Sequence, residues 1–216
     1  MNKWLSKNEV EGIRIMSKWD ENKEQKEENL FDTAYRLFID KGFQQTTISD
    51  IVQKAGVAKG TFYLYFKDKY DIRDRIIIKK TYALISEAIE ELEKDGVESF
   101  EAQLLFIVDY IVDYLDANQA LLNFMHRDLI LGIYKNAFSK MIRQNSEMTL
   151  MDLFVEGAKN NHYVMEKPEY VFCMILELIS TVAFSSIVLK EPGEIETVKP
   201  YLRQSILGII NVYKVS

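Results

Sequence analysis

Apolar residues recur at spacings of three and four along almost the whole chain, and this periodicity limits its possible folds more than any other feature. A helix places residues i, i+3 and i+4 on one face, so the pattern predicts helices. Helix breakers are few, with three prolines and nine glycines among 216 residues. No stretch shows the sustained alternation of β-branched residues that a strand requires. We therefore expect an all-α fold.

The pattern divides the chain into three parts: an N-terminal arm or helical extension (1–25), a small helical domain (26–72) and a larger one (73–216). A first helix is expected over 26–40, followed by two short helices, one ending at Gly56 and one starting near Ala58 or Lys59. The long helices are expected at about 69–93, 98–116, 118–128, 134–160, 168–190 and 194–213. The helix from Lys69 continues out of the small domain, so we expect a rigid junction between the two domains.

The charge of the chain is distributed unevenly. Residues 1–80 hold 16 Lys and Arg against 13 Asp and Glu, a net of +3, whereas residues 81–216 hold 11 against 20, a net of −9. A global charge of −6 argues against nucleic-acid binding. However, salt screens fields beyond about 10 Å, so a local basic face can still bind phosphate. The asymmetry suggests different tasks for the two parts.

The composition indicates a cytoplasmic protein. A single cysteine, Cys173, cannot form an internal disulfide and leaves no spacing for a structural zinc site. The first 29 residues lack the apolar core of a signal peptide. The run at 170–189, "YVFCMILELISTVAFSSIVL", is long enough to span a membrane. Because it carries Glu177 and several hydroxyl residues, we interpret it as a buried helix of a core or subunit interface.

The stretch "TTISDIVQKAGVAKGTFYLYFKDKYDI" (46–72) predicts a helix-turn-helix. Thr47 is the expected N-cap of the second helix, with Asp50 as a capping-box partner, and Thr46 is the alternative cap. Gly56 can end that helix at positive φ without a steric cost. The following helix begins Lys59-Gly60-Thr61, which offers an ammonium, room for close approach and a hydroxyl at the end that enters the DNA major groove in such units.

Four aromatic residues in the same stretch fall into two pairs. Phe62 and Phe66 are four apart, so they share one face and are expected to pack inward, on Leu37, Phe38 and Ile51. Tyr63 and Tyr65 are expected to point outward, where their hydroxyls could reach a phosphate. Taken alone, "KGTFYLYF" is also compatible with an ordinary amphipathic helix. We interpret Lys67 as a solvated surface charge.

The stretch "NLFDTAYRLFIDKGFQQTTISDIVQKAGVAKGTFYLYFKDKYDI" resembles the DNA-binding domain of the TetR family of transcriptional regulators. The shared features are the first helix ending in "KGF", the "TT" before the second helix, "AGV" at the turn, "KGTFYLYF", and a lysine three residues after Phe66. The resemblance covers about residues 26–75. It implies phosphate contacts from Thr47, Tyr63, Tyr65 and Lys69, and base contacts from Lys59, Gly60 and Thr61. The family more often has histidine where Tyr65 stands.

The second half contains no Gly-rich phosphate loop, HExxH motif or nucleophile elbow, so we expect neither an enzyme nor a cofactor. Only His126 and His162 could supply imidazole, and no metal site is expected. Aromatic and aspartate stripes are interpreted either as core and a solvated face or as an apolar effector cavity with orienting polar groups. The candidate ligand-binding residues are Phe106, Asp109, Tyr110, Tyr114, Phe124, Tyr134 and Phe138.

The charge of the effector depends on the orientation of Asp109 and Asp113. If either points inward, a cationic effector is favoured, and if neither does, a neutral or acyl-type ligand fits better. The apolar helices at about 168–190 and 194–213 suggest a homodimer interface formed by two hairpins, as in the TetR family. Glu177 in this run is expected to need a partner such as Arg203, in the same subunit or across the interface.

These features predict a ligand-responsive DNA-binding transcriptional regulator, a repressor released from a near-palindromic operator by a small apolar or amphipathic effector. Its expected partners are double-stranded operator DNA, the effector and a second copy of the chain, with no membrane. One alternative is a regulator of the same fold that activates or binds a protein partner. The other is a helical lipid- or ligand-binding protein of the same fold without DNA-binding activity.

Overall fold

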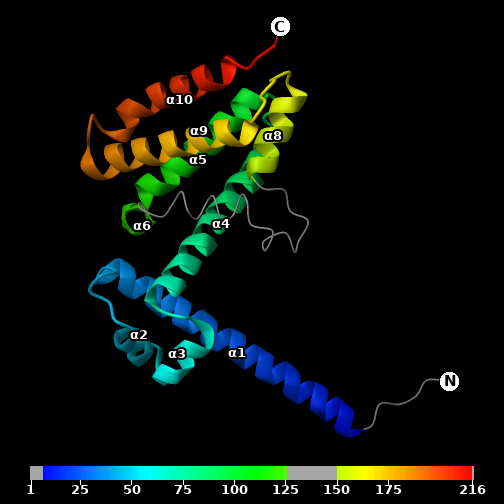
Figure 1. Cartoon of the computed structure of the whole chain (residues 1–216), viewed down its shortest axis with the longest axis vertical. Helices are drawn as coiled ribbons and strands as arrows, with labels where there is room; N and C mark the ends of the chain where they lie inside the picture. The colour runs from blue at the N-terminus through cyan, green and yellow to red at the C-terminus, as the bar shows by residue number, and fades with distance from the viewer. Residues whose placement is uncertain (1–6, 126–149, 216) are drawn as a thin grey trace, which may run out of the picture. The chain divides into compact units, whose positions relative to one another are not determined.

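The computed structural model describes residues 7–125 and 150–215 and, in the first helix, the side chains from residue 23 onward. Every named element in these ranges is a helix, which confirms the all-α prediction (Figure 1). The chain divides into two compact units, residues 1–76 and 77–216. An isolated bridge joins Tyr163 and Lys214.

The described residues of the first unit, 7–76, form three helices and the start of a fourth: α1 (Lys7–Asp40), α2 (Ile48–Ala55), α3 (Lys59–Tyr65) and α4 (Lys69–Asp95). The α1 helix begins at Lys7 and not at residue 26, because the Glu-, Lys- and Gln-rich sequence before residue 26 favours a helix. Of the two alternatives for the N-terminal segment, a frayed arm or a helical extension, the structure thus shows the extension from Lys7 onward.

The core of the first unit comes from the apolar stripes of its helices. Leu30, Ala34 and Phe38 of α1 are buried with Ile51 of α2. Phe62, at 0% exposure, and Phe66, at 1%, complete this core, which confirms the inward orientation predicted for both. The rings of Phe66 and Phe31 meet edge to face at 5.3 Å between centroids.

The second unit contains the rest of α4 and the helices α5 (Phe100–Ala117), α6 (Gln119–Met125), α8 (Leu150–Asn160), α9 (Pro168–Phe184), π-helical η1 (Ser185–Leu189) and α10 (Ile195–Asn211). Their bounds agree with the expected helices at 98–116, 168–190 and 194–213 to within a few residues. Residues 126–128 of one expected helix and 134–149 of another lie outside the described residues.

Helix α9 is the central helix of this unit and packs against α5, α8 and α10 (Figure 1). Together with η1 it is long and apolar enough to cross a membrane by length and composition, with a mean hydropathy of 2.2. However, 56% of the 18-residue window with this hydropathy is buried inside the protein. A core helix of a globular bundle has the same composition, so its packing already accounts for the apolar run.

Candidate DNA-binding surface and apolar cavity

Local chemistry fixes the corner between α2 and α3. Gly56 has φ +68°, the left-handed conformation predicted from its position, and its N–H donates to the carbonyl oxygens of Gln53 and Val52. Val57 N–H donates to Val52 O over 3.0 Å, which closes the turn. Ala58 then begins α3 in an extended conformation. The result is a helix-turn-helix.

The N-terminal end of α3 is open to solvent. Lys59 and Gly60 are exposed, and Thr61 is half-buried. Tyr63 is 52% exposed, and Tyr65 is half-buried on the next turn. Because Phe62 and Phe66 hold the opposite face in the core, α3 presents an ammonium, a bare backbone and hydroxyl groups on one outward surface. Such a surface can donate hydrogen bonds to base edges and to phosphates.

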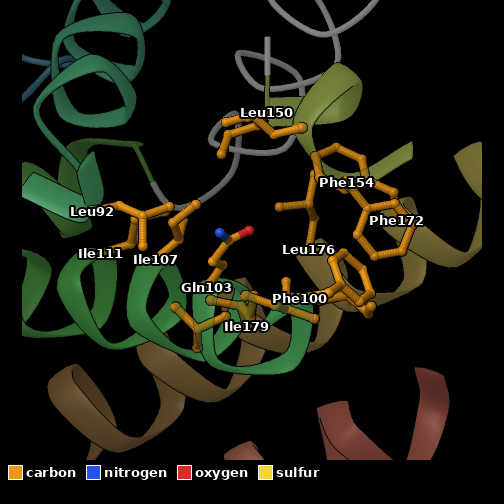
Figure 2. Close-up of a pocket in the computed structure, with 14 residues that line it drawn as sticks. Leu92, Phe100, Gln103, Ile107, Ile111, Leu150, Phe154, Phe172, Leu176 and Ile179 are labelled. Atoms are coloured by element: carbon orange, nitrogen blue, oxygen red, sulfur yellow. The ribbon is translucent and has the colours of Figure 1, made fainter. Parts of the chain in front are cut away.

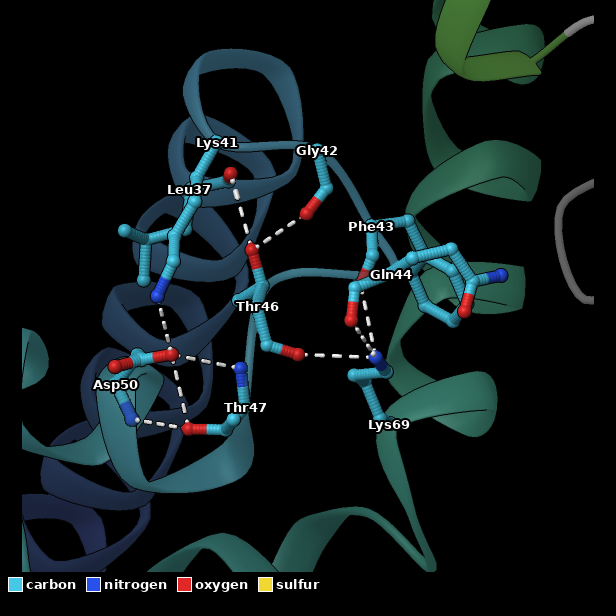
Figure 3. Close-up of polar contacts among 9 residues, drawn as sticks. All are labelled: Leu37, Lys41, Gly42, Phe43, Gln44, Thr46, Thr47, Asp50 and Lys69. Atoms are coloured by element: carbon cyan, nitrogen blue, oxygen red, sulfur yellow. Dashed lines mark hydrogen bonds and ion pairs between the residues drawn. The ribbon is translucent and has the colours of Figure 1, made fainter.

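The start of α2 carries the predicted capping box (Figure 3). Thr47 Oγ1 accepts from Asp50 N–H at 3.1 Å, and Thr47 N–H donates to Asp50 Oδ2 at 2.8 Å. Thr46, the alternative cap, is fully buried, and its hydroxyl lies near the carbonyl oxygens of Gly42 (2.8 Å) and Leu37 (3.2 Å). Thr47 is therefore the cap, and it remains exposed at the start of α2.

The hydrogen bond from Lys41, at 2.9 Å, together with the bonds from Thr47, lowers the pKa of Asp50 to about 2. A lowered carboxyl pKa stabilises the fold above the unfolded value of 3.8, and the stabilisation is lost as the pH falls through about 2. We expect Asp50→Asn to be less stable than the unmodified protein at pH 6. This difference in the free energy of unfolding should shrink as the pH falls towards 2. Urea unfolding at a series of pH values measures it. A difference that stays constant with pH would refute this account of the cap.

Lys69 makes contacts that differ from its predicted role. Its ammonium donates to the backbone carbonyl oxygens of Phe43 at 2.8 Å and Thr46 at 2.9 Å, with Gln44 O at 3.4 Å (Figure 3). It also lies 4.3 Å from the centroid of the Phe43 ring. The three acceptors all belong to the loop between α1 and α2, and they match the three hydrogens of the ammonium group. In this structure Lys69 therefore fastens the loop that leads into Thr47.

Phe43 is the centre of this attachment. Its ring meets those of Phe38 and Tyr70 edge to face at 5.1 and 5.2 Å. The Arg73 guanidinium lies 4.8 Å from the same ring. Phe43 is the phenylalanine of the "KGF" segment. The sequence pattern does not reveal that residues at the start of α4 pack against its ring. The start of α4 and the α1–α2 loop thus form one packed cluster.

In the second unit, α4, α5, α8 and α9 surround an apolar cavity of about 60 Å³ (Figure 2). Of the fourteen described residues that line it, thirteen are apolar, and Gln103 is the exception. The lining residues are Leu92, Phe100, Gln103, Leu104, Ile107, Val108, Ile111, Leu150, Leu153, Phe154, Phe172, Ile175, Leu176 and Ile179. Apolar cavities with a few placed polar groups are typical of small-molecule sites.

The cavity adjoins a different face of α5 from the one that carries the predicted ligand-binding residues. Phe106, Asp109, Tyr110 and Tyr114 of α5 and Phe124 of α6 do not line it. Tyr134 and Phe138 lie outside the described residues. The cavity instead contacts the stripe that includes Phe100, Gln103 and Ile107. The candidate ligand-binding residues therefore stay a prediction, and the cavity adjoins aliphatic residues that recur on α5 at the same helical spacing.

Ion pairs and hydrogen bonds explain where the other stripe of α5 points. Asp109 pairs with Arg203, and Asp113 pairs with Lys199, both on α10. Burial raises the pKa of Asp109, and the Arg203 charge opposes that shift. Tyr110 shares a hydrogen bond with Glu87, and burial raises its pKa. The two aspartates are therefore used to attach α10 to α5.

The expected partnership of Glu177 with Arg203 is not present within the chain, because Arg203 contacts Asp109 instead. Glu177 lies on an exposed stripe of α9. An exposed carboxylate keeps its hydration and needs no ion-pair partner within the subunit. The stripe also contains Tyr170 and Met174, which are 63% and 54% exposed.

Comparison with known families and curated proteins gives the following matches. Residues 30–76 match the family described as bacterial regulatory proteins, tetR family. The chain is 32% identical over 111 residues to an uncharacterized HTH-type transcriptional regulator, YvdT, of Bacillus subtilis, covering 50% of this chain and 51% of that one. It is 36% identical over 74 residues to a fatty acid metabolism regulator protein of the same species, covering 34% and 36%. The matches thus span about half or less of these relatives.

Two solved structures share the fold. One is a transcriptional regulator FadR from Bacillus subtilis in complex with stearoyl-CoA, with a TM-score of 0.62 and 18% identity, covering 84% of this chain and 98% of that one. The other is a TetR-family regulator from Syntrophomonas wolfei, also with a TM-score of 0.62 and 18% identity, covering 88% and 94%. At these identities the likeness concerns the fold alone.

Proposed function

We propose, from the membership of residues 30–76 in the TetR family of bacterial regulatory proteins, that the chain is a DNA-binding transcriptional repressor controlled by an apolar effector. The observation that carries the proposal is the exposed N-terminal end of α3 beside a buried Phe62. A recognition helix needs both properties, since it must be solvent-accessible on one face and rigidly held on the other.

The residue roles follow from exposure. Lys59, Gly60 and Thr61 would contact base edges, because they form the exposed first turn of α3. Tyr63 and Tyr65 would donate hydroxyl hydrogen bonds to phosphates. Thr47 would do so by exchanging the bond that its hydroxyl donates to Asp50 Oδ2 at 2.9 Å. We assign Lys69 a different part from the one that the family resemblance implies. Its contacts with the α1–α2 loop make it a positioning residue for the start of α2.

The salt dependence of DNA binding distinguishes the two possible roles of Lys69, a phosphate contact and the positioning of α2. A lysine that neutralises a phosphate contributes about 0.9 to the slope of log affinity against log salt. We expect Lys69→Met to leave the slope unchanged, to destabilise the first unit by about 1 kcal/mol through its lost hydrogen bonds, and to weaken binding by a few-fold. Anisotropy titrations of duplex DNA from about 50 to 300 mM salt measure the slope, and urea unfolding measures the stability.

Lys67→Met is the matched control, because Lys67 is an exposed lysine two residues earlier. It should leave stability unchanged. If Lys69→Met reduces the slope of log affinity against log salt by about 0.9 per site and keeps normal stability, Lys69 contacts a phosphate as the family resemblance implies. Failure of the unmodified chain to retain any duplex at low salt would instead favour the ligand-binding protein without DNA-binding activity.

The effector is proposed to be neutral or acyl-type. Asp109 and Asp113 are occupied by α10 and leave the described cavity lining without an acidic residue. A long aliphatic chain fits such a lining, and a fatty acid metabolism regulator is among the relatives. The FadR from Bacillus subtilis, which shares the fold, has been solved with stearoyl-CoA.

Effector binding would act by shifting a conformational equilibrium. The cavity volume of about 60 Å³ is far below the roughly 300–1,000 Å³ of ligand pockets. A larger ligand must therefore bind a state of the second unit in which the cavity is wider. Helix α4 supplies Leu92 to the cavity lining and Lys69 to the loop contacts. We propose that this helix transmits the change that weakens DNA binding.

The proposed assembly is a homodimer through α9 and α10. Tyr170 and Met174 of α9 and Tyr201 of α10 are more than half exposed. Large exposed apolar side chains on neighbouring helices are typical of interfaces between subunits. A two-fold dimer would present two α3 helices to a near-palindromic operator, with half-sites one or more turns of about 34 Å apart.

A further inference from the structure

Gln103 is the only polar residue among the described residues that line the cavity. It projects from α5, and its amide lies among the side chains of Ile107, Leu150 and Leu176 (Figure 2). In so apolar a lining, a single amide determines which polar group of a ligand can be accommodated. A buried polar group without a partner costs free energy, and one that meets a partner recovers it.

The orientation of this amide follows from its hydrogen bonds. Nε2 of Gln103 donates to Val97 O at 2.8 Å and points towards Glu98 O at 3.5 Å, in the loop before α5. Rotating the amide by 180° would place Oε1 against these two carbonyl oxygens, an arrangement of acceptors alone. The nitrogen is therefore committed to the loop. The oxygen is the atom that Gln103 offers to a ligand.

An acceptor oxygen selects a ligand with a hydrogen-bond donor. A hydroxyl or an amide N–H can donate to Oε1, whereas a carboxylate presents only acceptors and would bring a negative charge into an apolar lining. We propose that Gln103 is a specificity-determining residue of the cavity and that the preferred ligand is a neutral aliphatic molecule with a hydroxyl or amide N–H donor. This inference rests on the proposed function, in which the cavity holds the effector.

Calorimetric titration of the full chain at pH 7.4 with four straight-chain compounds of ten carbon atoms tests the proposal. Decanol and decanamide carry a donor, 1-methoxynonane is a neutral ether without one, and decanoate is an anion. We expect decanol and decanamide to bind about fivefold more tightly than the ether, as a single hydrogen bond predicts. They should bind at least about tenfold more tightly than decanoate, since the carboxylate must also be desolvated.

Gln103→Met removes the acceptor while keeping the length of the side chain. We expect the preference for donors over the ether to fall to less than about twofold, with the affinity for the ether little changed. Because this variant also loses the bond to Val97, Ser99→Ala serves as the matched control. It removes the N-cap bond that Ala102 N–H donates to Ser99 Oγ at the start of the same helix, outside the cavity. Ser99→Ala should keep the preference.

The outcomes separate the two proposals. If none of the compounds binds the unmodified chain, the assignment of the cavity as an effector site fails, and the inference fails with it. If the compounds bind but decanoate or the ether matches decanol, only the inference about Gln103 is overturned. A donor preference that persists in Gln103→Met also overturns it. The ranking in the unmodified protein is decisive even if the Met variant does not fold.

Discussion

Phe62→Ala should lower the free energy of unfolding of the first unit by about 3–5 kcal/mol. Phe62 is completely buried, and its ring meets those of Phe66 at 5.4 Å and Tyr63 at 5.5 Å between centroids. Truncation to alanine removes this burial and leaves a cavity that the short helices around it cannot fill. Because the same ring holds α3 in place, DNA binding should be lost in parallel. Urea unfolding followed by circular dichroism measures the change.

Leu64→Ala is the matched control for this substitution. Leu64 lies two residues away on the same seven-residue helix and is 79% exposed. Its truncation should change the stability by no more than about 0.5 kcal/mol, as for exposed sites in general. Equal effects at positions 62 and 64 would show that α3 is not held through Phe62.

Lys59→Ala should weaken binding to the preferred operator by about 1–3 kcal/mol, which is roughly 5- to 150-fold. Lys59 is exposed at the first position of α3, where an ammonium can reach guanine O6 and N7 or a phosphate. If it reads a base, discrimination between operator and unrelated duplex should fall with the affinity. If it contacts only phosphate, both duplexes should lose affinity equally. Competition titrations with the two duplexes distinguish these cases.

Lys67→Ala provides the comparison for Lys59. Lys67 lies beyond the C-terminal end of α3 and is exposed, and its backbone N–H, which an alanine retains, donates to Asp71. We expect its affinity for the operator to stay within about twofold of that of the unmodified protein. A larger loss at Lys67 than at Lys59 would contradict the assignment of the N-terminal end of α3 as the reading end.

The features of the first unit that the sequence predicts correctly depend on local chemistry. Thr47 and Asp50 are three residues apart, so their reciprocal cap is encoded in one turn of helix. Gly56 likewise ends α2 through the left-handed conformation of its own backbone. The four-residue spacing of Phe62 and Phe66 determines which face is buried. Such features need no knowledge of distant parts of the chain.

The features that the sequence does not predict depend on contacts between distant segments. The bond from Lys69 to Phe43 O joins residues 26 positions apart, and the pair of Arg203 with Asp109 joins residues 94 apart. Helix α5 packs against several helices, so its periodicity shows that more than one stripe is covered but not which stripe adjoins a cavity. The sequence therefore does not reveal that the described cavity adjoins Gln103 and its aliphatic neighbours and not the aromatic residues of α5.

We propose that the first unit reads duplex DNA through the N-terminal end of α3, as one half of a dimer. Selection of the full chain against a library of random duplexes, followed by sequencing, tests this proposal. We expect an enriched near-palindromic motif with half-sites about 10 base pairs apart, or a multiple of this spacing, and its loss in a Lys59→Ala, Thr61→Ala double variant. Absence of any enriched motif, or the same motif from the double variant, would contradict the claim.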